Sequence, residues 1–379
     1  MNDRFAKLRE EYPICQEGAY FQWAYRGALS RTSCERLRDL MESHSMRGAA
    51  DRPKWFEEYA RVGQLLAQAI NAPFDRLAYT PNTAWTMGMI AQGLHWQRGD
   101  EVLIPEGEFP SNVYPWMQLD RLGVTLRVVK SREGDAVNSQ RLLDEIRPNT
   151  KLIAASHVSF HNGYRLDIEG LCQGARAAGV WSVIDAAQSV GWCSLDLQAI
   201  GADAFVGVGR KFLCGLDGLG FVALSEGMNE ELRLIAPGPF SVKHQSEYLR
   251  HMRDWREDAG RFAGGGIASP QVFALGASLE LFEKSGGFKS VEPEVLSLVS
   301  QLRNKLQSQG IECLGNSWSL SEQSAVLKVL IPHVGIEQDL GLRGISVSER
   351  PGGIRVSLHA MNSASELDML VDELSKVVA

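Results

Sequence analysis

The sequence lacks the features that mark membrane proteins, disulfide-rich proteins and nucleic-acid-binding proteins. Its longest apolar runs, Leu152–Ser156 and Val180–Ile184, are strand-sized and far shorter than the ~20 residues of a membrane helix. The six cysteines are scattered without a C-x-x-C pair, which argues against a zinc knuckle or a disulfide scaffold. There is no block rich in lysine and arginine, and the formal net charge is −7. We therefore expect no membrane span, no metal site and no nucleic-acid partner.

The amino terminus also lacks the apolar core of a signal peptide. It reads MNDRFAKLREEYPIC and is rich in charge, so we expect a cytoplasmic protein. The composition, 44% hydrophobic and 22% charged, is that of an ordinary globular protein. A chain of 379 residues is too long for one comfortable core, which favours a large domain and a smaller one.

Short β-rich runs alternate with helical patterns between about residues 53 and 225. Several runs are almost continuously apolar, as expected for strands covered by helices on both faces. The alternation predicts an α/β domain with a mostly parallel, seven-stranded sheet. The predicted strands are Leu77–Tyr79, Glu101–Ile104, Thr125–Val129, Leu152–Ser156, Val180–Ile184, Ala204–Val208 and Gly220–Leu224, and the predicted helices are Thr83–Leu94, Ser111–Leu122, Ser139–Ile146 and Ile168–Ala178.

Beyond about residue 245 the pattern changes to long helices beside a few strands. It predicts a smaller α+β domain, so we divide the chain into an N-terminal segment (1–20) packing on the small domain, a large domain (21–250) and a small domain (251–379). Glycine-rich stretches at 238–240 and 260–266 are both plausible breaks near that boundary. The predicted elements are helices Pro270–Lys284, Glu292–Gln309 and Ala364–Val378 and strands Ala325–Ile331 and Gly353–Leu358.

An acid and a lysine follow two of the predicted inner strands. Asp185 comes directly after WSVI, at the carboxyl end of a strand, where ligands bind in parallel sheets. Gln188 follows three residues later, and Lys211 comes after the small apolar run FVGVG, 26 residues beyond Asp185. Packed surroundings lower the pKa of a lysine and favour imine formation. An acid that keeps a pyridine nitrogen protonated beside such a lysine is the arrangement that pyridoxal 5′-phosphate requires.

The same stretch carries a resemblance to a known family. D-A-A-Q-S-V-G, A-D-A-F, G-R-K-F-L-x-G and G-L-G-F resemble the signature of the class V aminotransferase superfamily of fold-type I pyridoxal phosphate enzymes. That superfamily includes cysteine desulfurases, kynureninases and isopenicillin N epimerase-like proteins. The resemblance implies that Lys211 and Asp185 are catalytic, that Gln188 hydrogen-bonds the ring's phenolic oxygen, and that the protein is a homodimer to which the segment YFQWAY contributes.

The resemblance also implies further site residues. Phe109 in EGEFPSNVYPW takes the place of the ring that stacks on the cofactor, and His157 in SHVSFHNG matches a segment near it. Arg355 in GGIRVSLHAMN matches the arginine that grips the substrate α-carboxylate, for which a planar fork is suited. The phosphate is expected at a helix start, where free N–H donors and the helix dipole attract an anion. The residues implied there are Asn82, Thr83, Ala84 and Arg210.

Three departures from the family pattern bear on function. The stretch GISVSERPGG has no cysteine where cysteine desulfurases carry their catalytic one, which disfavours persulfide chemistry. Val208 replaces a serine or threonine that usually contacts phosphate, and GGGIAS, which includes Gly266, replaces the segment that reaches the neighbouring subunit's phosphate. Phosphate anchoring is therefore expected to depend more on Arg210 and on the helix start at Asn82.

The signature is compatible with several reactions at an amino or 2-oxo acid. We expect an aminotransferase, with a lyase of the kynureninase or C–S type, or an epimerase, as alternatives. A non-catalytic relative that keeps the fold is a further alternative, suggested by the departures at Val208 and Gly266. A nicotinamide-dependent oxidoreductase is disfavoured because no G-x-G-x-x-G follows the first strand.

Overall fold

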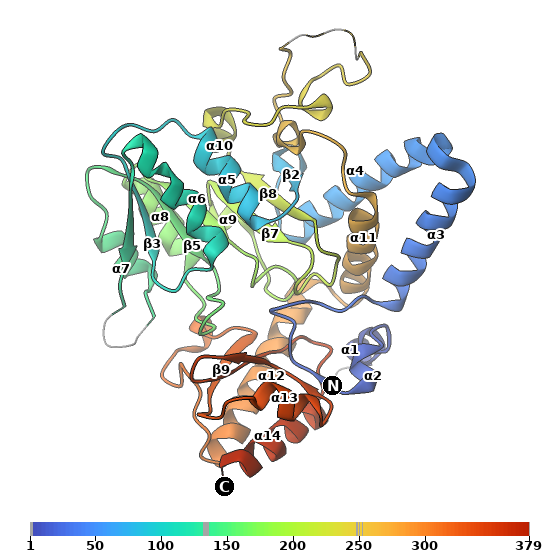
Figure 1. Cartoon of the computed structure of the whole chain (residues 1–379), viewed down its shortest axis with the longest axis vertical. Coiled ribbons are helices and arrows are strands. Elements are labelled where there is room, and N and C mark those ends of the chain that lie inside the picture. Colours follow the sequence, from blue (N-terminus) through green and yellow to red (C-terminus); the bar gives the residue numbers. More distant parts are fainter. Residues whose placement is uncertain (1–2, 132–135, 248, 250, 252, 379) are drawn as a thin grey trace.

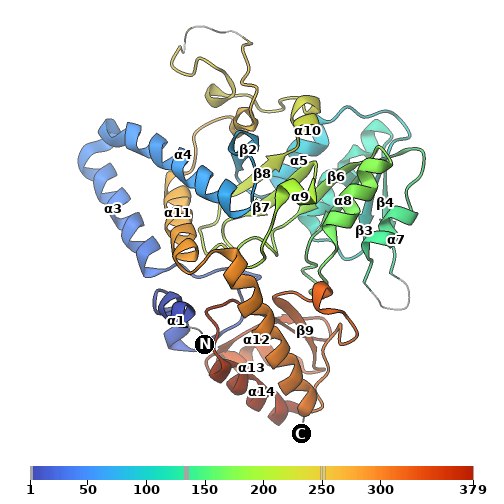
Figure 2. The ribbon, with the colours of Figure 1, turned by 180° about the vertical axis from the view of Figure 1, so that it is seen from behind.

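The computed structural model describes residues 3–131, 136–247, 249, 251 and 253–378. They form a larger part built on a central sheet and a smaller part that contains the C-terminal residues (Figure 1). Helix α12 (Phe288–Ser308) runs from the larger part along the smaller one, as the view from behind shows (Figure 2). The boundary predicted at 250/251 involves residue 250, outside the described residues, and the division into domains stays a prediction.

The larger part contains the predicted sheet, and the mostly parallel α/β fold is confirmed. The strand order is β2-β8-β7-β6-β5-β3-β4, and β8 alone runs antiparallel to its neighbours, β2 and β7. Strands β3, β6, β7 and β8 are almost wholly buried, which explains their continuous apolar sequences. The bounds are β2 Leu77–Thr80, β3 Glu101–Pro105, β4 Thr125–Val129, β5 Thr150–Ser156, β6 Trp181–Asp185, β7 Ala204–Val208 and β8 Gly220–Leu224.

Helices cover this sheet, and their starts are fixed by side-chain caps. Asn82, Asn138 and Asp167 each accept a hydrogen bond from a backbone N–H of the first turn of α5, α7 and α8. The helix predicted over Ser111–Leu122 is instead broken into short pieces, because Pro110 and Pro115 cannot donate to a continuous helical ladder. The bounds are α5 Thr83–Gly93, α6 Tyr114–Met117, α7 Ser139–Asp144, α8 Ile168–Ala177, α9 Leu197–Ile200 and α10 Glu226–Glu231.

Two helices before the sheet form an arm that extends to one side of the larger part (Figure 1). They are α3 (Arg31–Arg47) and α4 (Arg52–Ala69), and α11 (Ser269–Lys284) packs against both. Ser30 caps α3 by accepting a hydrogen bond from the N–H of Ser33. These two helices were not predicted from the sequence.

The smaller part contains a three-stranded antiparallel sheet in the order β11-β12-β9, which confirms the predicted α+β character. A two-stranded sheet joins β1 (Ala19–Tyr20) to β10 (Ile345–Ser346). The side chain of Arg9 contacts Met361, Cys15 and Glu366, which attaches the N-terminal residues to this part. The remaining bounds are α1 Asp3–Glu10, α2 Ile14–Glu17, β9 Val326–Leu330, α13 Ile336–Gly341, β11 Ser348–Arg350, β12 Gly353–Ser357 and α14 Ala364–Val378.

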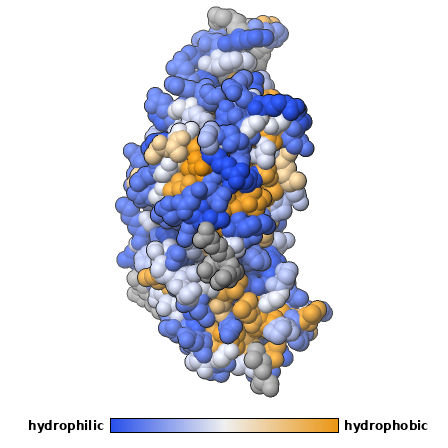
Figure 3. All heavy atoms as spheres, turned by 90° about the vertical axis from the view of Figure 1, so that its left-hand side faces the viewer, coloured by the Kyte–Doolittle hydropathy of each residue, from blue (hydrophilic) through white to orange (hydrophobic). Residues whose placement is uncertain are grey.

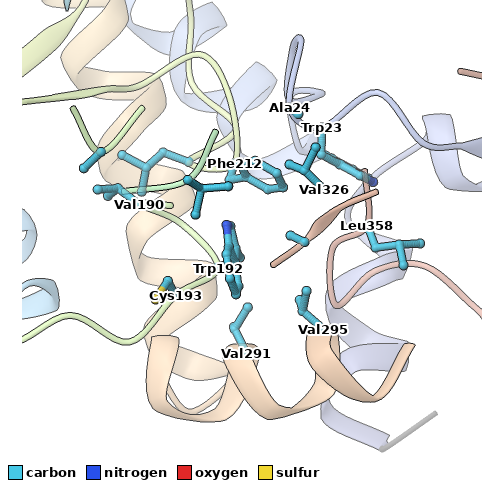
Figure 4. Packing of buried hydrophobic residues seen from close by; sticks show 14 of the residues in the cluster. Trp23, Ala24, Val190, Trp192, Cys193, Phe212, Val291, Val295, Val326 and Leu358 are labelled. Carbon is cyan, nitrogen blue, oxygen red and sulfur yellow. The ribbon is translucent and has the colours of Figure 1, made fainter. Parts of the chain in front are cut away.

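Trp192 lies where the two parts meet. Its indole stands between the chain at Val190, the α12 residues Val291 and Val295, and the C-terminal strands (Figure 4). It is fully buried, and its N–H donates to the carbonyl oxygen of Gln188 at 2.7 Å. One hydrophobic cluster thus extends from the larger part into the smaller one, whereas a second cluster lies within the larger part.

We expect Trp192→Phe to lower the free energy of unfolding by about 2 kcal/mol or more. The smaller ring leaves a cavity, and the carbonyl oxygen of Gln188 loses its donor. Denaturant titration measures the change. Trp255→Phe, at a partly exposed tryptophan, is the matched control, and an equal loss in both variants would contradict the role of Trp192.

The surface is mainly hydrophilic on the side shown in Figure 3, with two separate areas of hydrophobic residues. No helix in the described part of the chain is both long and apolar enough to cross a membrane. The six cysteines are free thiols, and all but Cys34 are buried. The described residues contain no group of three or more His, Cys, Asp or Glu side chains placed to hold a metal.

Candidate active site

A cavity of about 140 Å³ lies where loops leave the carboxyl ends of the parallel strands. Each of the strands β3, β5, β6 and β7 is followed by residues that line it, and the start of α5 closes one side. The lining residues are Asn82, Thr83, Ala84, Phe109, Ser111, Ser156, Phe160, Asp185, Ala187, Gln188, Val208, Arg210 and Lys211. Eight of the ten residues predicted for the site therefore lie around one cavity.

Asp185 is the last residue of β6 and faces this cavity. It pairs in register with Ser156 on β5, and its Oδ1 accepts a hydrogen bond from the N–H of Ala187 at 2.9 Å. Burial raises the pKa of the carboxyl group, whereas the charge of Lys211 and the Ala187 hydrogen bond lower it. Lys211 and Ala187 thus stabilise the ionised form of Asp185, whereas burial destabilises it.

Lys211 lies after β7 and lines the same cavity. The residue is 8% exposed. Burial lowers the pKa of its amine to about 7. The charge of Asp185 raises this pKa in part, and the charges of Arg210 and Arg355 lower it slightly further. The Nζ atom lies 5.8 Å from the centre of the Phe109 ring. A large share of this amine is therefore neutral near pH 7 and able to act as a nucleophile.

The segment before α3 packs over the lysine loop. The N–H of Gly27 donates to the carbonyl oxygen of Arg210 at 2.8 Å, and the side-chain amide of Gln188 donates to that of Ala24 at 3.2 Å. A Cβ on Gly27 would lie 2.1 Å from the carbonyl oxygen of Lys211, so only glycine allows this approach. The other amide atom of Gln188, Oε1, is buried and has no partner among the described residues.

The start of α5 offers unused donors at the cavity. The Oδ1 atom of Asn82 accepts a hydrogen bond from the N–H of Trp85 at 2.9 Å and so caps the helix. Within the described residues, no hydrogen bond uses the backbone N–H groups of Thr83 and Ala84. A helix start with free N–H groups binds anions well.

Arg210 lines the cavity but already has partners. Its Nη1 donates to the carbonyl oxygen of Tyr25 at 2.7 Å, and its Nε lies 3.2 Å from Oδ1 of Asp217. Its predicted contact with phosphate would have to use the guanidinium's other donors or follow a change of rotamer.

Arg355 and His157 do not line the cavity. Arg355, on β12, is 3% exposed, and its Nη1 donates to the carbonyl oxygen of Phe160, which does line it, at 3.2 Å. The backbone N–H of His157 donates to the carbonyl oxygen of Asp185 at 2.9 Å, but the residue lines a different cavity. Burial lowers the pKa of His157 to about 3, so this ring is neutral.

Phe160 and Glu108, which were not predicted from the sequence, also lie at or near the cavity. Phe160 packs edge-on against Phe109, with ring centroids 5.1 Å apart. The carboxylate of Glu108 accepts hydrogen bonds from the N–H and the hydroxyl of Ser156, both at 2.6 Å, and burial raises its pKa to about 7. Glu108 could have been found from the sequence, because it is an acid directly before Phe109. Phe160 could not, because its place at the cavity depends on the path of the loop after β5.

Comparison with known proteins gives related sequences. The family model described as aminotransferase class-V matches residues 41–370. A probable cysteine desulfurase of Methanothermobacter thermautotrophicus is 29% identical over 330 residues, 82% of each chain. An uncharacterized aminotransferase of Schizosaccharomyces pombe is 24% identical and covers 99% of this chain and 96% of its own length. The isopenicillin N epimerase of Streptomyces clavuligerus is 32% identical over a shorter stretch, 44% of this chain and 43% of its own.

Solved structures share the fold. A variant of C-DES with glycine covalently linked to its PLP cofactor superimposes with a TM-score of 0.90 at 22% identity, covering 97% of this chain and 99% of that one. A complex described as that of the cystine C–S lyase C-DES with cysteine persulfide gives a TM-score of 0.89 at 23% identity, with the same coverage. The apo cysteine desulfurase of Thermococcus onnurineus gives 0.88 at 21% identity and covers 98% of each chain.

Proposed function

This chain belongs to the aminotransferase class-V family, whose members are pyridoxal 5′-phosphate-dependent enzymes, and we propose that Lys211 attaches the cofactor while Asp185 sets its charge. The observation that carries the proposal is the buried acid–amine pair lining one cavity at the carboxyl edge of the sheet. Each member of the pair shifts the pKa of the other toward its charged form.

The residues around the cavity fit the cofactor. Gln188 keeps an amide atom without a partner, and the start of α5 keeps two N–H groups without acceptors. The ring of Phe109 lies near the amine, where it can cover one face of a flat ligand. Acid, amine, aromatic ring and anion site are thus all present in one place.

Each of these residues has a distinct task in the proposal. The bound cofactor would supply an electron sink for a bond broken at the substrate Cα. Asp185 would keep a proton on the ring nitrogen, because its buried carboxylate would gain a cationic partner there. Lys211 would provide the attaching amine, and its free amine would move the proton at the substrate Cα. Phe109 and Phe160 would keep water from that amine, and Thr83 and Ala84 would bind phosphate through their backbone N–H groups.

We propose further that the reaction is cleavage at the substrate β-carbon, as in a C–S lyase, rather than transamination. The related proteins include probable cysteine desulfurases and a cystine C–S lyase, which supports a lyase over the aminotransferase favoured in the sequence analysis. No cysteine follows Cys313, so β10, β11 and β12 provide no thiol to accept sulfur. Elimination needs no such thiol. Aminotransferase and epimerase activities remain the alternatives.

Product analysis separates these reactions. We expect ammonia and a 2-oxo acid to form from a β-substituted amino acid without any added 2-oxo acid acceptor. Turnover that depends strictly on such an acceptor would instead indicate transamination. Inversion at Cα without release of ammonia would indicate epimerisation.

Cofactor attachment should depend on pH through Lys211. With a pKa of about 7, the amine is mostly neutral above pH 7 and becomes protonated as the pH falls. The rate of covalent attachment to cofactor-free protein should therefore fall about tenfold from pH 8 to pH 6. Borohydride reduction at timed intervals, followed by intact mass, measures it. A rate that keeps rising up to pH 10 would contradict the lowered pKa.

We also propose a homodimer. Tyr114 and Ile235 are exposed and line a shallow apolar hollow beside α5, near the cavity. The segment YFQWAY was predicted to contribute to the dimer interface. Phe21 and Trp23 are fully buried within the chain, and Tyr25 is 55% exposed. Tyr114→Asp should shift the mass measured by light scattering from dimer to monomer, and an unchanged mass would count against this surface.

A further inference from the structure

One face of the small antiparallel sheet carries three cationic side chains. Arg355 on β12 pairs directly with Lys328 on β9, and Arg350 on β11 pairs with Gly353, two residues before Arg355. Residues paired in register, and residues two apart on a strand, point to the same side of a sheet. Lys328, Arg350 and Arg355 therefore form one cationic face, while Ile354 and Val356 belong to the opposite, apolar face.

The charges of this cationic face are not balanced locally. Lys328 is 2% exposed and Arg355 is 3% exposed. Within the described residues, none of the three cations forms an ion pair, and each has a carbonyl oxygen as its hydrogen-bond acceptor: Pro351 for Lys328, Glu349 for Arg350 and Phe160 for Arg355. Buried cations are costly unless an anion accompanies them.

The neighbouring groups increase this imbalance. Burial, and then the charge of Arg350, lower the pKa of Arg355 to about 10 and also lower that of Lys328. Burial, and then the charges of Lys328 and Arg350, lower the pKa of His161, and this side chain adds no negative charge. A bound anion would relieve this mutual repulsion.

The cationic face is adjacent to the proposed active site. Arg355 donates to the carbonyl oxygen of Phe160, whose residue lines the cavity of Lys211 and Asp185. The charge of Arg355 also contributes to the lowered pKa of Lys211. A substrate attached near Lys211 can therefore direct its anionic groups toward the cationic face.

We propose that the substrate is an amino acid with an anionic side chain, whose second anionic group binds Lys328 and Arg350 while its α-carboxylate binds Arg355. This inference rests on the proposed function. One arginine can bind one carboxylate through two hydrogen bonds. Three cations without an acidic partner carry enough positive charge for two anionic groups. The same cationic face disfavours an amino acid with a cationic side chain.

The test compares an unreactive pair of ligands that differ in one charge. Succinate and its monoamide have nearly the same shape and lack the amine that reacts. Titration calorimetry on cofactor-loaded protein should give a dissociation constant about tenfold lower, or more, for succinate. In Lys328→Met the two constants should become similar. Lys376→Met, an exposed lysine on α14, is the matched control and should keep the wild-type ratio.

A second variant keeps the test informative if Lys328→Met does not fold. Arg350 is only half-buried, so Arg350→Gln should fold even if Lys328→Met does not, and it should also reduce the preference for succinate. Equal binding of the two ligands by wild-type protein would overturn the inference. So would a loss in Lys328→Met that weakens both ligands alike. Failure of the proposed function is recognised separately, because borohydride would then trap no cofactor on Lys211.

Discussion

Replacing Lys211 by alanine is expected to abolish covalent attachment of the cofactor and to reduce turnover by ~10³-fold or more. The amine is buried and has a pKa of about 7, so no other described lysine offers comparable reactivity at this cavity. Intact mass after borohydride reduction of the cofactor-loaded protein measures the attachment directly. Wild-type protein should gain the mass of one reduced cofactor, and Lys211→Ala should gain none.

Two further variants define the control for this experiment. Lys289→Ala removes an exposed lysine at the start of α12 and should retain full labelling. Lys211→Arg keeps a cation beside Asp185 but cannot form an imine, so it should fold and still remain unlabelled. Labelling of Lys211→Ala at the wild-type level would show that another amine holds the cofactor.

Asp185→Asn is expected to reduce turnover by about 10²- to 10⁴-fold while the protein keeps its cofactor. Asparagine keeps the shape and can still accept the hydrogen bond from the N–H of Ala187. It removes the charge that would hold a proton on the ring nitrogen. Cofactor content from absorbance and turnover of one substrate are measured on the same sample. Asp167→Asn, where asparagine can still cap α8, is the matched control.

The two substitutions should not be additive, because the residues act on each other. Lys211 lowers the pKa of Asp185, and Asp185 raises that of Lys211. The double variant should therefore lose little more activity than Lys211→Ala alone. A loss equal to the product of the two single losses would indicate that the residues work independently.

The sheet and its reactive edge could be predicted because both depend on local patterns. Continuous apolar runs mark strands buried on both faces, and the residues that follow their carboxyl ends must meet at one edge. Asp185 and Lys211 follow two such runs, so their meeting at one cavity was predictable. The family resemblance added Phe109 and the helix start at Asn82, which line the same cavity.

Other features depend on packing that the sequence pattern does not reveal. In the arm, α3 lacks a clear apolar stripe, because only Ser33 and Leu40 are buried in it. The buried residues of α4, from Tyr59 to Ala67, do follow helical spacing, so that helix could have been predicted. Phe160 reaches the cavity through the path of its loop. The cationic face required the register between β9 and β12, which places Lys328 opposite Arg355 although the two residues are 27 positions apart. His157 was predicted beside the cofactor, whereas the residue lines another cavity; its role stays a prediction.

The segment between β1 and α3 connects the lysine loop to residues near the C-terminus. The N–H of Ala24 donates to the hydroxyl of Ser357, 333 positions away, and the indole N–H of Trp23 donates to Asn362. During synthesis on the ribosome, this early segment must therefore wait for almost the whole chain before it finds its final partners. Contacts between residues so distant along the chain form slowly. The cavity should therefore become able to bind a ligand only after the central sheet has assembled.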